Sequence, residues 1–183
     1  MADVNERLRS AAKSGDEVNL IALLNDPECD VLATSAKGMT ALMEASYYGH
    51  EACIHHLLPV SDALAKANDG LTALMWAAFF GHEACVRLLI PTSDALAMDH
   101  GGKTALMWTA RHGNEACVGL LLPTSDLLAT DADGRTASAW ARKNGHEILA
   151  QFIDAYVLAQ SEQAALGVAV KPGAPRGRAS HRV

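Results

Sequence analysis

Apolar and polar positions along the chain repeat with a fixed period of 32 residues. Each period holds a Gly-x-Thr step, a mostly apolar stretch such as ALMWAAFF, a Gly-His or Gly-Asn step, and a second apolar stretch such as EACVRLL. Such a period is typical of chains that stack one small structural unit many times. The pattern predicts two short helices and a turn in each unit. The units lie near residues 5–37, 38–69, 70–101, 102–133 and 134–156.

Helix boundaries are indicated by residues that recur at fixed places in the units. A threonine oxygen can accept a hydrogen bond from the first turn of a helix, so the recurring threonines are expected to cap the first helices. Glycine adopts the left-handed conformation that closes a helix, and the proline ring prevents the second helix from continuing. The expected caps are Thr40, Thr72, Thr104 and Thr136, and the expected stops are Gly49, Gly81, Gly113, Gly145, Pro59, Pro91 and Pro123.

The last unit differs from the others in a way that is typical of the end of a stacked array. Ser138 and Arg142 stand where an earlier unit has leucine and alanine, which indicates a polar cap. A further helical stretch, residues 157–166, is expected to complete this cap. Residues 167–183 contain proline and glycine without apolar periodicity, so a disordered basic tail is expected there.

Composition and charge narrow the class of protein. The chain has 183 residues, half of them apolar, and a formal net charge of -6, which fits one soluble globular unit. It shows neither an apolar signal region nor a stretch of the ~18 apolar residues that span a bilayer, so a cytoplasmic protein without a membrane span is expected. Four basic residues and one acidic residue lie within 157–183, so residues 1–156 carry -9. This charge argues against nucleic-acid binding by the folded array.

Two stretches of the sequence resemble the ankyrin repeat family. DGLTALMWAAFFGH is similar to the family's D-G-x-T-P-L-H-x-A-A-x-x-G-H pattern and DALAMDHGGKT to its hairpin pattern, and the resemblance covers roughly residues 5–156. It implies an all-α solenoid of about five stacked helix-turn-helix units with short hairpin loops, acting as a non-catalytic protein-protein interaction module. Methionine replaces the family's histidine at Met43, Met75 and Met107, so thioether packing is expected in place of histidine hydrogen bonds.

Most recurring residues are interpreted as structural. The three tryptophans share one position of successive units and are expected to pack between units. Three cysteines share an apolar position, and equivalent atoms of stacked helices lie on the order of 10 Å apart, which is too far for a disulfide. Buried thiols of a reducing compartment are therefore expected. These residues are Trp76, Trp108, Trp140, Cys53, Cys85 and Cys117.

Candidate chemical sites fail on spacing. His50, Glu51 and His55 give H-E-x-x-x-H rather than the H-E-x-x-H of zinc helices, so the two imidazoles do not share the face that such a site requires. GGKT at residues 101–104 imitates the end of a phosphate-binding loop, but Ala97 occupies the position of its first glycine. No catalytic residue, metal or cofactor is therefore predicted.

Positions that differ between units are expected to face solvent or a partner, because a stacked array must repeat its packing positions. The two residues before each Gly-His or Gly-Asn step change completely, and the resemblance places them at the ends of the first helices, on the concave binding face. The hairpin tips vary as well. We therefore predict a protein or peptide partner at a surface that is aromatic in its middle and basic toward the C-terminus. Its residues are Tyr47, Tyr48, Phe79, Phe80, Arg111, His112, Lys37, Met39, Asn68, Asp69, Leu71, His100, Lys103 and Arg135.

Three alternatives stay open at this point. The first is that one ring of each aromatic pair packs on its own unit, because adjacent helix positions point about 100° apart. The second is a secreted or membrane-directed effector or adaptor that uses the basic tail as a second signal. The third is an enzyme without a recognisable motif. The chain is expected to be a monomer.

Overall fold

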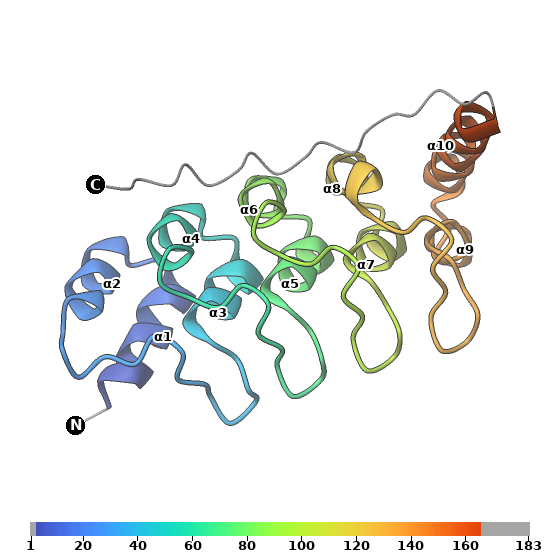
Figure 1. Ribbon diagram of the computed structural model, residues 1–183. Helices are drawn as coiled ribbons and strands as arrows, with labels where there is room; N and C mark the ends of the chain where they lie inside the picture. The colour runs from blue at the N-terminus through green and yellow to red at the C-terminus, as the bar shows by residue number, and fades with distance from the viewer. Residues whose placement is uncertain (1–2, 166–183) are drawn as a thin grey trace, which may run out of the picture.

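A computed structural model describes residues 3–165, and within them ten α-helices form two layers (Figure 1). The odd-numbered helices form one layer together with the loops that extend from them, and the even-numbered helices form the other. The described part of the chain contains no strand, so the predicted all-α class is confirmed. The elements are α1 (Val4–Ser14), α2 (Glu17–Leu24), α3 (Ala41–Tyr48), α4 (Glu51–Leu57), α5 (Ala73–Phe80), α6 (Glu83–Leu89), α7 (Ala105–His112), α8 (Glu115–Leu121), a 3-10 turn η1 (Leu122–Thr124), α9 (Ala137–Lys143) and α10 (Glu147–Ala165).

Recurring side chains begin and end the first helix of each pair, as the sequence predicts. A threonine hydroxyl accepts from the backbone N–H three residues later at 3.3–3.4 Å, which satisfies one donor of the opening turn. Left-handed glycines, Gly49, Gly81 and Gly113, end α3, α5 and α7. The last unit differs, because α9 is capped by Asn144 and the left-handed Gly145 follows it.

The core is one continuous column between the two layers, because every unit buries the same positions. The adjacent Leu74 and Met75 of α5 are 0% and 1% exposed, and their equivalents in α3 and α7 are buried to the same extent. The prediction that the methionine thioethers pack in the core is therefore confirmed. Cys53, Cys85 and Cys117 are likewise buried. Each large side chain contributes about 1.5–3 kcal/mol by burial, and much of that burial requires a neighbouring unit.

The loops that precede the first helices are joined edge to edge by backbone hydrogen bonds of 3.0–3.2 Å. The donor and acceptor residues are Asn68 and Lys37, His100 and Asp69, and Ala132 and Gly101. Gly70 shows why glycine recurs here. Its φ is +84°, and a Cβ at this position would lie 2.7 Å from the His100 backbone nitrogen. Only glycine fits both the left-handed backbone and the close approach of the next loop.

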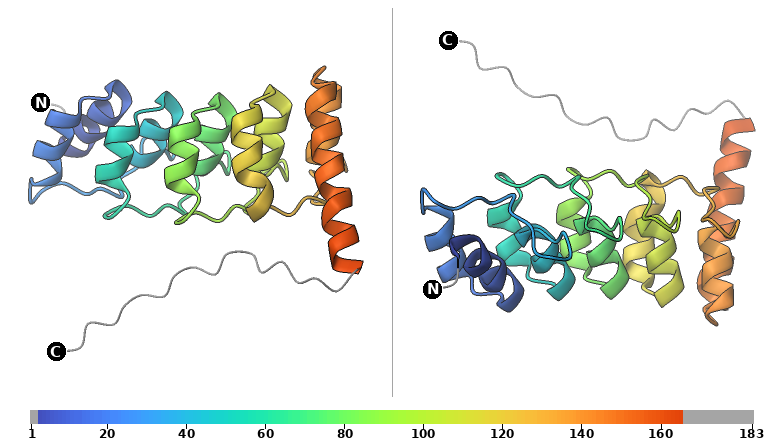
Figure 2. Two further views of the ribbon diagram at one scale, coloured as in Figure 1. Left: turned by 90° about the horizontal axis from the view of Figure 1, so that it is seen from above. Right: turned by 90° about the horizontal axis from the view of Figure 1, so that it is seen from below.

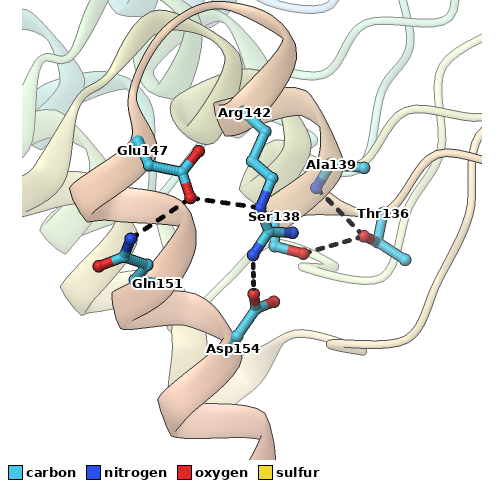
Figure 3. Close-up of polar contacts among 7 residues, drawn as sticks. All are labelled: Thr136, Ser138, Ala139, Arg142, Glu147, Gln151 and Asp154. Carbon is cyan, nitrogen blue, oxygen red and sulfur yellow. Dashed lines mark hydrogen bonds and ion pairs between the residues drawn. The ribbon is translucent and has the colours of Figure 1, made fainter.

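Polar contacts join α9 and α10 at the C-terminal end of the array (Figure 3). The Arg142 guanidinium of α9 donates to Asp154 of α10 and lies 3.5 Å from Glu147, whose carboxylate also accepts from Gln151 at 3.4 Å. Ser138 lies on the same helix as Arg142, and its hydroxyl is hydrogen-bonded to that of the capping threonine. Arg142 and its carboxylate partners agree with the predicted polar cap, but Ser138 is buried and α10 also exposes Ile148, Phe152 and Leu158, so the end as a whole is not polar.

Helix α10 has 19 residues and extends past the edge of the array (Figure 2), whereas the other second helices have seven or eight. Residues 157–165 of the predicted helical cap are the last turns of α10. The predicted disordered tail, 167–183, lies outside the described residues.

Candidate functional site

The predicted contact pairs at the ends of the first helices touch one another across unit boundaries. The ring centroids of Tyr47 and Phe80 lie 4.4 Å apart, and those of Phe79 and His112 lie 4.3 Å apart. Within each pair, Tyr47 and Tyr48 and likewise Phe79 and Phe80 are separated by 4.7 Å. Three units therefore share one aromatic strip, which consists of Tyr48, Tyr47, Phe80, Phe79 and His112.

The two members of each pair are buried to different extents. Tyr48 and Phe80 are 41% and 40% exposed, whereas Tyr47 and Phe79 are half-buried. The half-buried rings lie against the tryptophan of the following unit, with Tyr47 5.1 Å from Trp76 and Phe79 5.0 Å from the next tryptophan in the row. One ring of each pair therefore packs between units while the other faces solvent.

The recurring tryptophans lie between units, as predicted, and two of them are fixed by carboxylates. The Trp108 indole nitrogen donates to Asp99 at 3.1 Å, and that of Trp140 donates to Asp131 at 2.9 Å. In each case the carboxylate comes from the loop nine residues earlier. Within residues 3–165 the buried indole nitrogen of Trp76 has no hydrogen-bond acceptor.

Four cations surround Trp140 at the C-terminal end of the same face. The ammonium nitrogens of Lys103 and Lys143 and the guanidinium carbons of Arg111 and Arg135 lie 4.9–5.5 Å from the indole centroid, within the range of cation-π attraction. We call these four residues the cationic cluster. In the described part of the chain only Arg135 of this cluster forms an ion pair, with an aspartate two residues before it. The other three side chains form no ion pair within residues 3–165.

Burial and hydrogen bonding set the charges of two groups on this face. Burial alone would raise the pKa of Asp131. The pKa is instead below its ordinary value, because the carboxylate accepts hydrogen bonds from the Arg135 and Asp133 backbones and from the Trp140 indole, and because the positive charge of Lys103 is nearby. Burial lowers the pKa of His112, and nearby positive charge lowers it further. At neutral pH Asp131 is therefore ionised, and His112 is a neutral aromatic member of the strip.

Comparison with known families decides the identity of this architecture. The chain matches the family described as ankyrin repeats (3 copies) over residues 8–99 and 92–161. The chain belongs to the ankyrin repeat family. No curated protein matches it. Ankyrin repeats generally mediate protein-protein interaction, and ankyrin repeat proteins are typically non-catalytic.

The prediction that Met39 and Leu71 belong to the contact surface is wrong, because each is only 6% exposed. They occupy the position of Lys103, whose side chain lies over Trp108 of its own unit. This position directly precedes the capping threonine of the first helix, and an apolar side chain there is buried. The other predicted hairpin residues, Lys37, Asn68, Asp69 and His100, are exposed.

Sequence reasoning missed Lys143 as a site residue. Its side chain lies 4.9 Å from the Trp140 ring, three residues earlier on α9. Residues three apart on a helix are neighbours, and Arg111 lies over Trp108 by the same spacing. The available signal was therefore a basic residue three positions after each of the last two tryptophans.

The described residues also bear on the predicted absence of other sites. Within 3–165 no group of three histidine, cysteine, aspartate or glutamate residues is placed to hold a metal ion. None of the helices in that range is both long and apolar enough to cross a membrane. All four cysteines are free thiols, and burial raises the pKa of Cys85 and Cys117 to about 11.

Proposed function

We propose that the ankyrin array binds a segment of a partner protein along its concave face, without catalysis of its own. The aromatic strip carries this proposal. It continues from Tyr48 to His112 across three units, and two of its rings are about two-fifths exposed. Single exposed apolar side chains are common on proteins, but contiguous apolar patches mark interaction sites.

The exposed rings of the strip are suited to anchor a partner. Tyrosine is enriched among the residues that dominate binding energy, and aromatic rings bury a large area while fixing few torsions. A cavity of about 340 Å³ lies at the N-terminal end of the strip, where Tyr47 and Tyr48 line it together with Lys13, Lys37 and Glu44. It offers a place for one partner side chain beside the anchor rings.

The cationic cluster gives the face a direction. Along the array the surface changes from aromatic at Tyr48 to cationic at Lys143, and three cations of the cluster have no ion-pair partner in residues 3–165. A partner segment that presents apolar residues to the strip and acidic residues to the cluster is favoured in one orientation, because Glu44 accompanies Lys13 and Lys37 at the other end of the strip. Charge complementarity of this kind mainly sets orientation and association rate.

The anchors are tested by replacing the two exposed rings, in the double variant Tyr48→Ser/Phe80→Ser. We expect binding to a partner recovered by affinity capture from native lysate to weaken by more than about 2 kcal/mol, or about 30-fold, in an equilibrium titration. The melting temperature should fall less than the loss of fully buried rings would cause, because each ring is about two-fifths exposed and packs on Tyr47 with its other side. Val60→Ser, at an exposed loop position, is the matched control. Parent-like binding by the double variant would contradict the proposal.

The cationic cluster is tested by the charge reversals Lys103→Glu and Arg111→Glu in one variant. Stopped-flow association with the same partner should slow, and its dependence on salt should flatten or invert, because like charges then oppose the encounter. Lys66→Glu/Arg87→Glu, at two exposed positions outside the concave site, makes the same change of net charge and is the control. An association rate equal to that of this control would argue against an acidic partner segment.

A further inference from the structure

A second recurring surface lies in the loops that follow the second helices. Leu32, Leu64, Leu96 and Leu128 are separated by 32 residues each and are 54%, 56%, 54% and 71% exposed. We call them the leucine row. A recurring apolar residue in a stacked array normally packs in the core, but these four do not. Their repetition is therefore not explained by burial.

Each leucine of the row is held by an aspartate two residues before it. The carboxylate accepts a hydrogen bond from the leucine backbone N–H at 2.9–3.0 Å, which fixes the turn. These aspartates are exposed, and none forms an ion pair within residues 3–165. We call them the aspartate row: Asp30, Asp62, Asp94 and Asp126.

The leucine row lies apart from the aromatic strip. The strip is at the C-terminal ends of the first helices, whereas the leucines follow the C-terminal ends of the second helices. In Figure 2 these connecting loops line one edge of the array. Adjacent loops of this edge are in contact, since the Lys66 ammonium donates to the Met98 carbonyl of the next loop at 2.8 Å. The edge therefore carries the leucine row beside the aspartate row, with the Lys66 ammonium between two of the loops.

We propose that this edge binds a basic amphipathic α-helix with an apolar residue at every seventh position. Stacked helices lie about 8–10 Å apart. Successive leucines of the row come from successive units, so we expect about the same distance between them. Seven residues of an α-helix rise about 10.5 Å, which matches this spacing. Lysine or arginine on the flanks of such a helix would meet the aspartate row. The proposal does not depend on the concave face.

A designed peptide tests this inference on the full-length protein. The probe is a fluorescein-labelled helix of about 22 residues with leucine at every seventh position and lysine or alanine elsewhere. Its control has the same length and composition, with the same four leucines placed five residues apart, which distributes them around the helix. In fluorescence anisotropy the parent should bind the first peptide at least about tenfold more tightly than the control. Equal affinity for both peptides would reduce the effect to charge attraction and overturn the proposal.

Matched variants locate the binding. Leu64→Ser/Leu96→Ser should weaken binding of the seven-residue-period peptide at least about tenfold with an unchanged melting temperature, because both leucines are exposed. Asp62→Asn/Asp94→Asn should weaken binding and reduce its dependence on salt. Phe80→Ser should leave it unchanged. The inference fails if the leucine variant binds as the parent does or if Phe80→Ser abolishes binding. It also fails if sedimentation shows a parent dimer that the leucine variant dissociates, since the row would then bind a second copy.

Discussion

Trp76 and Trp108 occupy the same position of successive ankyrin units, yet the surroundings of their indole nitrogens differ. Trp108 donates to Asp99, nine residues before it, at 3.1 Å. The residue nine positions before Trp76 is Ala67, and in the described chain the Trp76 nitrogen is buried without an acceptor. A buried polar group without a partner costs about 1–3 kcal/mol. The difference between Asp99 and Ala67 therefore decides whether the buried indole N–H at the unit boundary has an acceptor.

The backbone does not explain this difference. The N–H of Ala67 donates to the carbonyl four residues later at 2.9 Å, and that of Asp99 makes the equivalent bond at the same distance. The two loops thus have the same turn. In the later loop, one Asp99 oxygen accepts from the Gly101 and Lys103 N–H groups while the other accepts from the indole. A single carboxylate ties the loop to the first helix there, and the earlier loop has no such tie.

The largest effect on this comparison should come from removing the rings. Trp108→Ala should lower the free energy of unfolding by about 3–5 kcal/mol, because it leaves a cavity against Phe79 and an unpaired Asp99 oxygen. Trp76→Ala should cost about 1 kcal/mol less, since it also removes the orphaned indole N–H. Urea unfolding followed by circular dichroism measures both. Equal losses would show that the carboxylate bond adds nothing to ring packing.

The second prediction concerns the carboxylate and its charge. Asp131→Asn presents an amide where Trp140 donates, and the free energy of unfolding should fall by about 1–3 kcal/mol at pH 7. The pKa of Asp131 is lowered in the folded state, so its charge stabilises the fold above the ordinary aspartate pKa. That contribution is lost as pH falls through the lowered value. The gap between parent and variant should therefore be full above about pH 4 and narrow below it. A gap independent of pH would contradict an ionised Asp131.

The repeated elements of the fold could be predicted from sequence because their causes are local. A threonine cap needs only the N–H three residues on, and the Gly49, Gly81 and Gly113 stops need only their own left-handed backbone. Each signal recurs in register, so one unit checks the next. The last unit differs from this pattern, because α9 ends at Asn144 and the left-handed Gly145 follows one residue later.

The candidate site could be predicted only in part, because sequence variation between units has two causes. Tyr47 and Phe79 vary between units and were assigned to the contact surface, yet both are half-buried against the next tryptophan. Arg111 fills the equivalent position and lies 5.0 Å from the Trp140 ring. The tryptophan face accepts an aromatic ring or a guanidinium alike, so this packing position tolerates different chemistry. Variation there does not by itself indicate exposure.

The opposite error concerns residues that recur. The leucine row repeats in the first four units and is exposed, although recurrence was taken to indicate packing. The aspartate before each leucine fixes the turn, and the leucine side chain is exposed there. A turn residue two positions away is a sequence signal, but its effect on the neighbouring side chain depends on how the loop sits on the second helix. That placement is set by stacking and was not available from the pattern.

The smallest predicted effect repairs the unsatisfied boundary. Ala67→Asp should raise the free energy of unfolding by about 1 kcal/mol, since the new carboxylate would accept from the Trp76 indole with the turn already in place. The gain should be smaller than the loss in Asp131→Asn. Lys103 lies near Asp131, whereas its equivalent beside the new carboxylate is the uncharged Met39.

Ala67→Asn is the control, because it supplies an acceptor without charge and separates the hydrogen bond from the electrostatic cost. Urea unfolding of both variants, each also made in a Trp76→Phe background that lacks the indole N–H, gives the coupling. If the gain from Ala67→Asp is the same in both backgrounds, the orphaned nitrogen is not its source.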